Sequence, residues 1–275
     1  MNKPSSVILA ICVLLFSFSA CAKTQASREN RVALIQFDTK PGENEHNVHQ
    51  MERLARQADS QGANIIMFHE LAVMDYVDDV SKYAEYVPEG PSYQKMEALA
   101  RELDAYICFG LAEKTKDDRH YITYVFTGPE GFIYKYRKTW IWRAAEDKGY
   151  RNEWARYDTG TGPEIFEIAG IKATCFICAD GESPRCITRA AGLKPELIFY
   201  PNNRSTYLGD RPSFSERAAA IGAPMLVTNR VGQSWHAETK GGCSVISATG
   251  EVLAKTDPAG QEEILIYDLV LDGAQ

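Results

Sequence analysis

The chain has 275 residues, of which 45% are hydrophobic and 24% charged, and its formal net charge is −7 at pH 7. This length and composition are typical of one sizeable globular domain with enough apolar material for a core. The acidic balance, and a sequence without any dense run of Lys and Arg, argue against nucleic-acid binding.

The first 30 residues have the pattern of an export segment rather than of a folded element. Lys3 precedes an apolar stretch from Val7 to Phe18, which is too short to span a bilayer as a mature helix. Small residues directly before Cys21 are typical of a bacterial lipoprotein processing site, although Phe18 replaces the usual aliphatic residue. We expect an export signal over 1–20, lipid on Cys21 that anchors the protein to a membrane surface, and a tether over 22–30. Simple cleavage would instead give a soluble periplasmic or secreted protein.

Five cysteines remain after Cys12 and Cys21 are assigned to this segment. They are Cys108, Cys175, Cys178, Cys186 and Cys243. Because five is odd, at least one thiol stays free. Cys175 and Cys178 have a C-x-x-C spacing, but residues three apart on a strand point to opposite faces, so we predict neither a redox pair nor a zinc site. We expect no metal and no cofactor.

The elements expected in the first half alternate between strands and helices. A helix is indicated by apolar or small residues at helical spacing, namely Met51, Leu54, Ala55 and Ala58. The turn Gly128-Pro129-Glu130-Gly131 predicts a hairpin. In chain order we expect a strand over 31–37, a helix over 44–61, a strand over 64–68, a helix over 94–103, and strands over 105–113, 121–127 and 132–138.

The second half begins with a polar and aromatic segment, 139–163, that has no clean period and is predicted to be a functional loop. The alternation then resumes. Strands are expected over 165–168, 172–177, 197–200, 225–229, 243–247, 251–255 and 264–269, with helices over 183–191 and 213–221. This pattern predicts an α/β or α+β protein in which helices cover sheets, as one domain over 31–271.

Three chemically reactive residues occupy similar positions at the ends of predicted strands. Glu70 follows the strand 64–68, Lys138 ends the strand 132–138, and Cys178 ends the apolar run 171–178. We expect them to meet at one rim of a sheet, where a base, a cation for an oxyanion and a thiol complete a set for acyl transfer. A helix N-terminus and nearby cations are expected to lower the pKa of Cys178. Taken singly, the three also fit a polar cap on a sheet edge, a solvated charge and an inert core thiol.

The sequence resembles the nitrilase superfamily of carbon–nitrogen hydrolases, in the family's order and approximate spacing. The resemblance covers roughly 31–271, and its motifs are ALIQFD near Arg31, His-Glu-Leu at 69–71, Tyr-Arg-Lys at 136–138, ICAD-G-x-S-P at 177–184, Pro-Asn-Asn at 201–203, Arg-Ala at 217–218, Thr-Asn-Arg at 228–230, Gly-Cys-Ser at 242–244 and Gly-Glu-Val-Leu-Ala at 250–254. It implies a four-layer α-β-β-α sandwich that forms a homo-oligomer, a dimer or higher.

The resemblance also implies roles for individual residues. Glu70 would be the general base, Lys138 would stabilise the oxyanion, Cys178 would be the nucleophile, and the Ala179 N–H would be a second oxyanion donor. Lys138, Trp142 and Glu146 match the amidase spacing K-x-x-x-W-x-x-x-E, so Glu146 would bind the substrate amide and the lysine. Trp142, Asn202 and Asn203 are further candidates for contact with the substrate.

Several departures from the family pattern leave the substrate branch open. Arg185 stands where glutamate is usual, Ile122 replaces an asparagine, and Thr139-Trp140 replaces His-Leu. Because Asp180-Gly181 and Glu146 resemble amidases, we predict hydrolysis of a small linear amide through a Cys thioester, with release of ammonia or an amine. Alternatives are hydrolysis of N-carbamoyl amines or amino acids, nitrile hydrolysis, acyl transfer to an amine, and a catalytically silent surface-binding lipoprotein.

Overall fold

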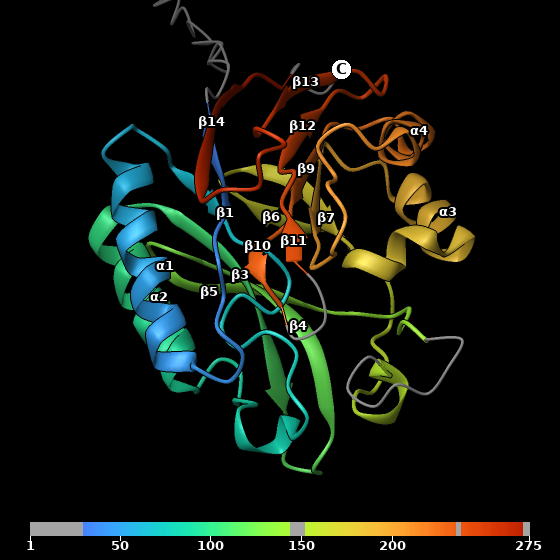
Figure 1. Ribbon diagram of the computed structural model, residues 1–275. Helices are drawn as coiled ribbons and strands as arrows, with labels where there is room; N and C mark the ends of the chain where they lie inside the picture. Colours follow the sequence, from blue (N-terminus) through green and yellow to red (C-terminus); the bar gives the residue numbers. More distant parts are fainter. Residues whose placement is uncertain (1–29, 144–151, 235–237, 272–275) are drawn as a thin grey trace, which may run out of the picture.

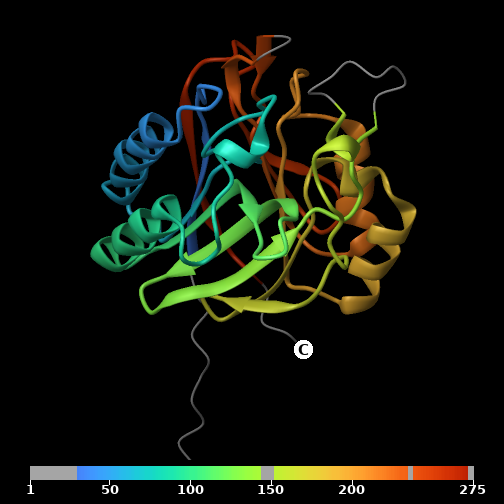
Figure 2. The ribbon, with the colours of Figure 1, turned by 90° about the horizontal axis from the view of Figure 1, so that it is seen from below.

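The computed structural model describes residues 30–143, 152–234 and 238–271. Two six-stranded sheets lie face to face, and a pair of α-helices covers the outer side of each sheet (Figure 1). The view from below shows the same four layers, with α1 and α2 on one side and α3 and α4 on the other (Figure 2). The predicted α-β-β-α sandwich is therefore confirmed.

The first sheet has the strand order β14-β1-β2-β3-β4-β5. These strands are β14 (Glu263–Leu269), β1 (Asn30–Gln36), β2 (Ile65–Met67), β3 (Tyr106–Lys114), β4 (His120–Gly128) and β5 (Gly131–Arg137). Strands β1, β2 and β3 are parallel, whereas β3, β4 and β5 pair antiparallel. The predicted hairpin is the β4–β5 pair. Because β5 runs in the same direction as β2, the carboxyl ends of β2 and β5 lie at the same edge of the sheet.

Helices α1 (Asn44–Asp59) and α2 (Pro91–Leu103) cover this sheet. The apolar residues that predicted α1 are buried in a core cluster that α1 and α2 share with the outer face of the sheet. Helix α2 begins three residues before the predicted position, at Pro91. Proline suits the first helical position because its fixed φ matches the helix and no backbone donor is lost there.

The second sheet has the order β13-β12-β9-β8-β7-β6. These strands are β13 (Val252–Lys255), β12 (Ser244–Ile246), β9 (Met225–Thr228), β8 (Leu197–Pro201), β7 (Ile171–Cys175) and β6 (Phe166–Ile168). Helices α3 (Pro184–Leu193) and α4 (Pro212–Ile221) cover it. Strand β7 ends two residues earlier than predicted, and Cys178 begins the short 3₁₀ helix η4 (Cys178–Glu182).

Some short elements were not predicted from the sequence. They are the 3₁₀ helices η1 (Val80–Lys82) and η3 (Glu153–Ala155) and the two-stranded ribbon of β10 (Val231–Gln233) and β11 (Glu238–Lys240). At three residues each, they are too short to show a recognisable period.

Aromatic side chains join the two sheets in the central core. The Phe126 ring on β4 lies 4.4 Å from Phe166 and 5.1 Å from Phe199, measured between ring centroids. Phe166 and Phe199 belong to β6 and β8 of the opposite sheet. Close-packed contacts of this kind fix the two sheets relative to each other. The loops at the end of one sheet are therefore held at a fixed distance from the loops at the end of the other.

Within the described ranges, none of the helices has both the length and the apolar character to cross a bilayer. The predicted export signal and Cys21 lie outside the described residues, as does the tether up to residue 29. All five cysteines of the domain are free and buried, in agreement with the prediction of at least one free thiol.

Candidate active site

Glu70 lies in the loop that leaves β2 and crosses close over β3. A Cβ atom at Gly110 of β3 would lie 2.3 Å from the backbone nitrogen of Leu71, so only glycine permits this approach. The Val73 N–H donates to the Gly110 carbonyl at 3.1 Å, and the Tyr124 hydroxyl donates to the Phe68 carbonyl at 2.6 Å. The backbone around Glu70 is therefore held directly against the sheet.

Neutral donors hold the Glu70 carbonyl. The Asn203 amide donates to it at 3.3 Å and to Asp75 Oδ1 at 2.9 Å. His69 Nδ1 lies 2.9 Å from the same carbonyl. Burial, reinforced by the nearby Arg230 guanidinium, lowers the pKa of His69 to about 3, so the ring is neutral. Because a carbonyl oxygen only accepts, Nδ1 carries the proton, and Nε2 accepts from the Thr39 hydroxyl at 2.8 Å.

Lys138 lies directly after β5 and is completely buried between two carboxylates. Its Nζ atom is 2.8 Å from Glu70 Oε1 and 2.8 Å from Glu153 Oε1. The Tyr76 hydroxyl donates to the same two oxygens, at 3.3 Å and 2.6 Å. Burial alone would lower the pKa of Lys138, but Glu153 and Glu70 together raise it well above its ordinary value. The amine therefore stays an ammonium ion.

Cys178 occupies a backbone conformation that is unusual for a non-glycine residue. Its φ is +44°, in the left-handed region, where a Cβ atom is strained. The Cys178 carbonyl accepts hydrogen bonds from the Tyr200 hydroxyl at 2.7 Å and from Arg204 Nη2 at 2.9 Å. These bonds hold the sharp turn between β7 and α3.

Asp180 joins this turn to the segment after Lys138. Its carboxylate accepts from the Ile177 N–H at 2.9 Å, the Thr139 N–H at 3.0 Å and the Tyr136 hydroxyl at 2.8 Å. Burial raises the pKa of Asp180 to about 6, although hydrogen bonds from the Trp140 N–H, the Ile177 N–H and the Tyr136 hydroxyl oppose the shift. The nucleophile turn of one sheet and the lysine of the other are therefore linked through one side chain.

A cavity of about 460 Å³ opens over the nucleophile, a size that suits a small molecule. Its lining includes Cys178 and Ala179 together with Tyr76, Trp142 and Glu153. Glu153 also accepts the Trp142 N–H at 2.7 Å through Oε2. Glu70 and Lys138 are buried behind this lining and contact it through the Tyr76 hydroxyl and Glu153.

The pKa of the nucleophile differs from the prediction. Burial, with a further contribution from Glu70 and Glu153, raises the pKa of Cys178 to about 11, although Arg204 and Lys138 lower it. The expected lowering is therefore wrong, because desolvation outweighs the cations. Burial also raises the pKa of Glu70, while Lys138 and a hydrogen bond from the Cys178 thiol lower it. In the resting site the Cys178 thiol therefore carries its proton at neutral pH, and it lies next to Glu70.

The sequence-predicted residues fall into three groups. Glu70, Lys138 and Cys178 are brought together, but at one end of the sandwich rather than on one rim of a single sheet. Ala179, Trp142 and Asn203 line the cavity. Asn202 does not: its buried side chain donates to the Tyr200 carbonyl at 2.9 Å and accepts from Arg204 Nε at 3.1 Å, so it supports the loop after β8 instead of touching the substrate space.

Glu146 lies outside the described residues. Among the described residues, the second acid that contacts Lys138 is Glu153, which sequence reasoning missed together with Tyr76. Both acids belong to the same aperiodic loop, and the spacing to Trp142 favoured Glu146. No local pattern marks Glu153, since only its tertiary contacts distinguish it.

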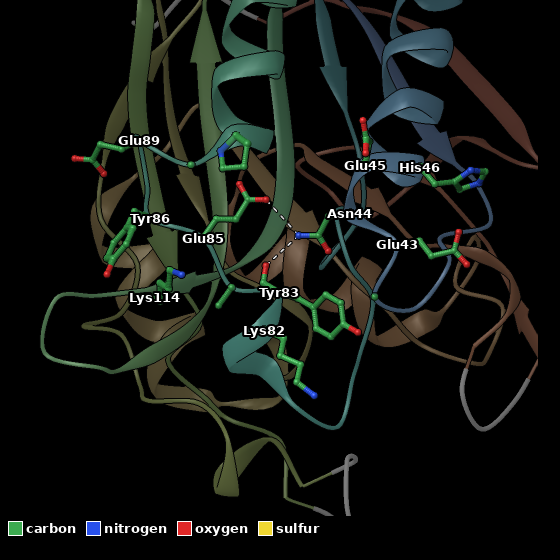
Figure 3. A pocket seen from close by; sticks show the side chains of 14 residues that line it. Glu43, Asn44, Glu45, His46, Lys82, Tyr83, Glu85, Tyr86, Glu89 and Lys114 are labelled. Carbon is green, nitrogen blue, oxygen red and sulfur yellow. Dashed lines mark hydrogen bonds between the residues drawn. The ribbon is translucent and has the colours of Figure 1, made fainter.

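A second cavity, of about 730 Å³, lies away from these groups, between the N-terminal ends of α1 and α2 (Figure 3). Its central carboxylate, Glu85, accepts hydrogen bonds from the Ser92 N–H at 2.8 Å, the Ser92 hydroxyl at 2.6 Å and Asn44 Nδ2 at 3.2 Å. Glu85 therefore caps α2 and holds it to α1, which is a structural role.

Known proteins resemble this chain in sequence and in fold. A family model described as carbon-nitrogen hydrolase matches residues 31–275. The chain is 27% identical over 245 residues to a nitrilase of Pyrococcus abyssi, covering 88% of this chain and 90% of the relative. It is 28% identical over 254 residues to N-carbamoylputrescine amidase of Arabidopsis thaliana, covering 82% of each. The fold matches an amidase of the nitrilase superfamily from Nesterenkonia with a TM-score of 0.78, at 20% identity and over 88% and 90% of the two chains. The protein therefore belongs to the carbon–nitrogen hydrolase family and is a C–N hydrolase.

Proposed function

We propose that this enzyme hydrolyses the C–N bond of a small linear amide through a thioester on Cys178, with release of ammonia or an amine. The observation that carries the proposal is the buried contact of Lys138 with both Glu70 and Glu153 beside a cavity that Cys178 lines. This arrangement supplies a base, an oxyanion donor and a nucleophile within one enclosed space.

Acylation begins with transfer of the thiol proton to Glu70. With a pKa near 11, only a fraction on the order of 10⁻⁴ of Cys178 is thiolate at neutral pH, so proton transfer accompanies attack on the carbonyl carbon. The S–C bond forms and the carbonyl oxygen becomes an oxyanion. An ammonium has three donors, and two of those on Lys138 go to carboxylates, so the third is left for this oxyanion.

The tetrahedral intermediate then loses its amine. Glu70 returns the proton to nitrogen, the C–N bond breaks, and ammonia or an amine leaves a thioester behind. Glu70 next takes a proton from water, the resulting hydroxide attacks the thioester carbon, and the C–S bond breaks. The proton on Glu70 returns to sulfur as the carboxylic acid departs. The backbone N–H of Ala179 is the proposed second oxyanion donor, and each such donor lowers the barrier by about 2.7–4 kcal/mol.

Ammonia release from short amides, N-carbamoyl amines and nitriles tests the reaction class. We expect turnover of short amides and a thioester adduct, visible by mass spectrometry, on the wild-type chain. Cys178→Ala and Cys178→Ser should lose both, whereas the matched variant Cys243→Ala should keep both. Full activity in either Cys178 variant would overturn the nucleophile assignment. Absence of turnover with all three substrate classes would refute the proposed hydrolysis of small amides.

Hydrolysis of N-carbamoyl amines is the second candidate. The similarity to a plant N-carbamoylputrescine amidase favours it, and the same residues would act on a carbamoyl carbon with release of an amine and carbamate. The substrate screen separates the two, because only this candidate predicts a lower KM for N-carbamoyl compounds than for simple amides.

We further propose that the enzyme is exported and anchored to a membrane of the cell envelope through lipid on Cys21. The apolar stretch and the small residues before Cys21 support this placement. Cys21→Ser should move the protein from the membrane fraction to the soluble fraction, and persistent pelleting would contradict lipid anchoring. Assembly into a dimer or higher homo-oligomer is proposed from the family resemblance and is measured by light scattering after size-exclusion chromatography.

A further inference from the structure

One wall of the active-site cavity carries an excess of positive charge. Arg204 and Arg211 line the cavity beside Glu182. With Arg217 they surround the ring of Phe214, with guanidinium carbons 6.0, 5.7 and 5.2 Å from its centroid for residues 204, 211 and 217. Glu182 is the carboxylate that these three cations influence, since each of them lowers its pKa. Three guanidinium groups and one carboxylate leave a net charge of +2 on this group.

Two of the three arginines are already engaged. Arg204 pairs with Glu182 Oε1 at 2.9 Å and also holds the Cys178 carbonyl. Arg217 pairs with Glu182 Oε2 at 2.8 Å and donates to the Tyr200 hydroxyl at 3.3 Å. Both oxygens of Glu182 are therefore occupied, and both arginines help to fix the nucleophile turn.

Arg211 is different. Its Nε donates to the Ser213 hydroxyl at 3.3 Å, and among the described residues no carboxylate lies within ion-pair distance of its guanidinium. Its two terminal nitrogens make no hydrogen bond to the described part of the chain. A planar guanidinium with two free terminal nitrogens is suited to bidentate contact with a carboxylate.

The catalytic end of the cavity has the opposite charge. Glu70 and Glu153 share one cation, Lys138, which leaves a net charge of −1 there when both acids are ionised. A substrate is consequently favoured if its reactive end is neutral and its far end is anionic. An ammonium group at the far end of the substrate would instead face Arg204 and Arg211, and such contact between like charges opposes binding.

We infer that the substrate is an amide whose other end carries a carboxylate, as in the monoamide of a short dicarboxylic acid, and that Arg211 binds this carboxylate. The inference rests on the proposed amide hydrolysis and narrows it. It also separates this enzyme from a hydrolase of N-carbamoylputrescine, whose substrate carries an ammonium group at the end remote from the carbamoyl carbon.

Three amides of similar size test the charge preference. Succinamate is anionic, levulinamide is its neutral analogue, and γ-aminobutyramide is cationic. We expect the wild-type enzyme to prefer them in that order. Arg211→Gln should reduce kcat/KM for succinamate by about 10- to 100-fold, mainly through KM, because a hydrogen bond to a charged group is lost. The same variant should change kcat/KM for levulinamide by no more than about twofold. Arg211→Glu should raise kcat/KM for γ-aminobutyramide relative to that for succinamate.

Controls distinguish this inference from a structural role for Arg211. The exposed Arg185→Gln on α3 changes net charge equally and should not alter the preference. A structural role would reduce turnover of all three amides in parallel, and that result would overturn the inference while leaving amide hydrolysis intact. Turnover of levulinamide and succinamate with equal kcat/KM in the wild type would do the same.

A binding measurement keeps the inference testable without turnover. Calorimetry with the Cys178→Ser protein should show succinamate binding that weakens by about 10- to 100-fold when Arg211→Gln is added. The affinity should also fall as salt concentration rises, because the partly exposed pair is screened. Equal affinity with and without Arg211 would refute the carboxylate site, whatever the catalytic result.

Discussion

Exchange of Glu153 for glutamine tests whether the second acid of the site is Glu153, which contacts Lys138 in the structure, or Glu146, which the sequence spacing favoured. Glu153 Oε1 accepts from Lys138 Nζ and the Tyr76 hydroxyl, and Oε2 accepts from the Trp142 N–H. Glutamine has the same shape, but its NH₂ group must face either the Trp142 N–H or the Lys138 ammonium, so a donor meets a donor in both orientations. The loss of one hydrogen bond between charged groups costs about 1.5–3 kcal/mol. We expect kcat to fall by about 10- to 150-fold.

The pH profile gives this prediction a second, independent outcome. Glu153 raises the pKa of Glu70 through like-charge repulsion, so its neutralisation should lower the pKa of Glu70. The acid limb of kcat/KM against pH should therefore move to lower pH in Glu153→Gln. The exposed Glu130→Gln in the β4–β5 turn is the matched control. If Glu153→Gln retains wild-type kcat and pH profile while Glu146→Gln loses activity, the role belongs to Glu146 and the reasoning is refuted.

Three further predictions follow from pKa directions and close contacts. Burial raises the pKa of Cys178 to about 11, so the thiolate absorbance of this residue should stay small below about pH 9. The absorbance is measured as the difference between wild type and Cys178→Ser. A plateau of this difference near pH 8 would contradict the raised pKa. Asp180→Asn should lower the free energy of unfolding by about 1–3 kcal/mol through lost acceptors. Burial raises the pKa of Asp180 to about 6, so the folded protein holds this proton more tightly than the unfolded chain does. The stability advantage of wild type over Asp180→Asn should therefore shrink as pH rises from about 4 to 6. A difference in the free energy of unfolding that stays constant over this range in denaturant titrations would contradict the prediction. Gly110→Ala should displace the Glu70 loop and reduce kcat by more than tenfold, since a Cβ would lie 2.3 Å from the Leu71 nitrogen, and an unchanged kcat would show that the loop adapts.

The catalytic core was predictable because its residues follow regular elements. The apolar run before Glu70 and the apolar run before Cys178 both mark buried strands, and polar residues that end such strands lie outside the sheet. The sequence does not say which sheet each strand joins. Strand pairing over a distance of 100 residues is a tertiary property, so the position of Cys178 on the second sheet appeared only in the structure.

The remaining parts of the site have no periodic signature. Tyr76 and Arg211 come from irregular segments and Glu153 from a 3₁₀ helix of three residues, where side-chain direction depends on contacts far away along the chain. The sign of the Cys178 pKa shift was missed for a related reason. A helix N-terminus and cations are visible in a sequence, but the depth of burial, which outweighs them here, is not.

The raised pKa values explain why the site needs two acids for one lysine. A single Glu70–Lys138 pair would favour ionised Glu70 so strongly that the carboxylate would be a weak base. The charge of Glu153 repels that of Glu70 and so raises the pKa of Glu70. In the proposed reaction Glu70 becomes protonated during attack, and the Glu153 carboxylate then remains as the counter-ion of Lys138. The ammonium therefore keeps a buried counter-ion at every step, which avoids the large cost of an isolated buried charge. In the proposed mechanism, Glu153 thus lets Glu70 gain and lose a proton while Lys138 stays charged for the oxyanion.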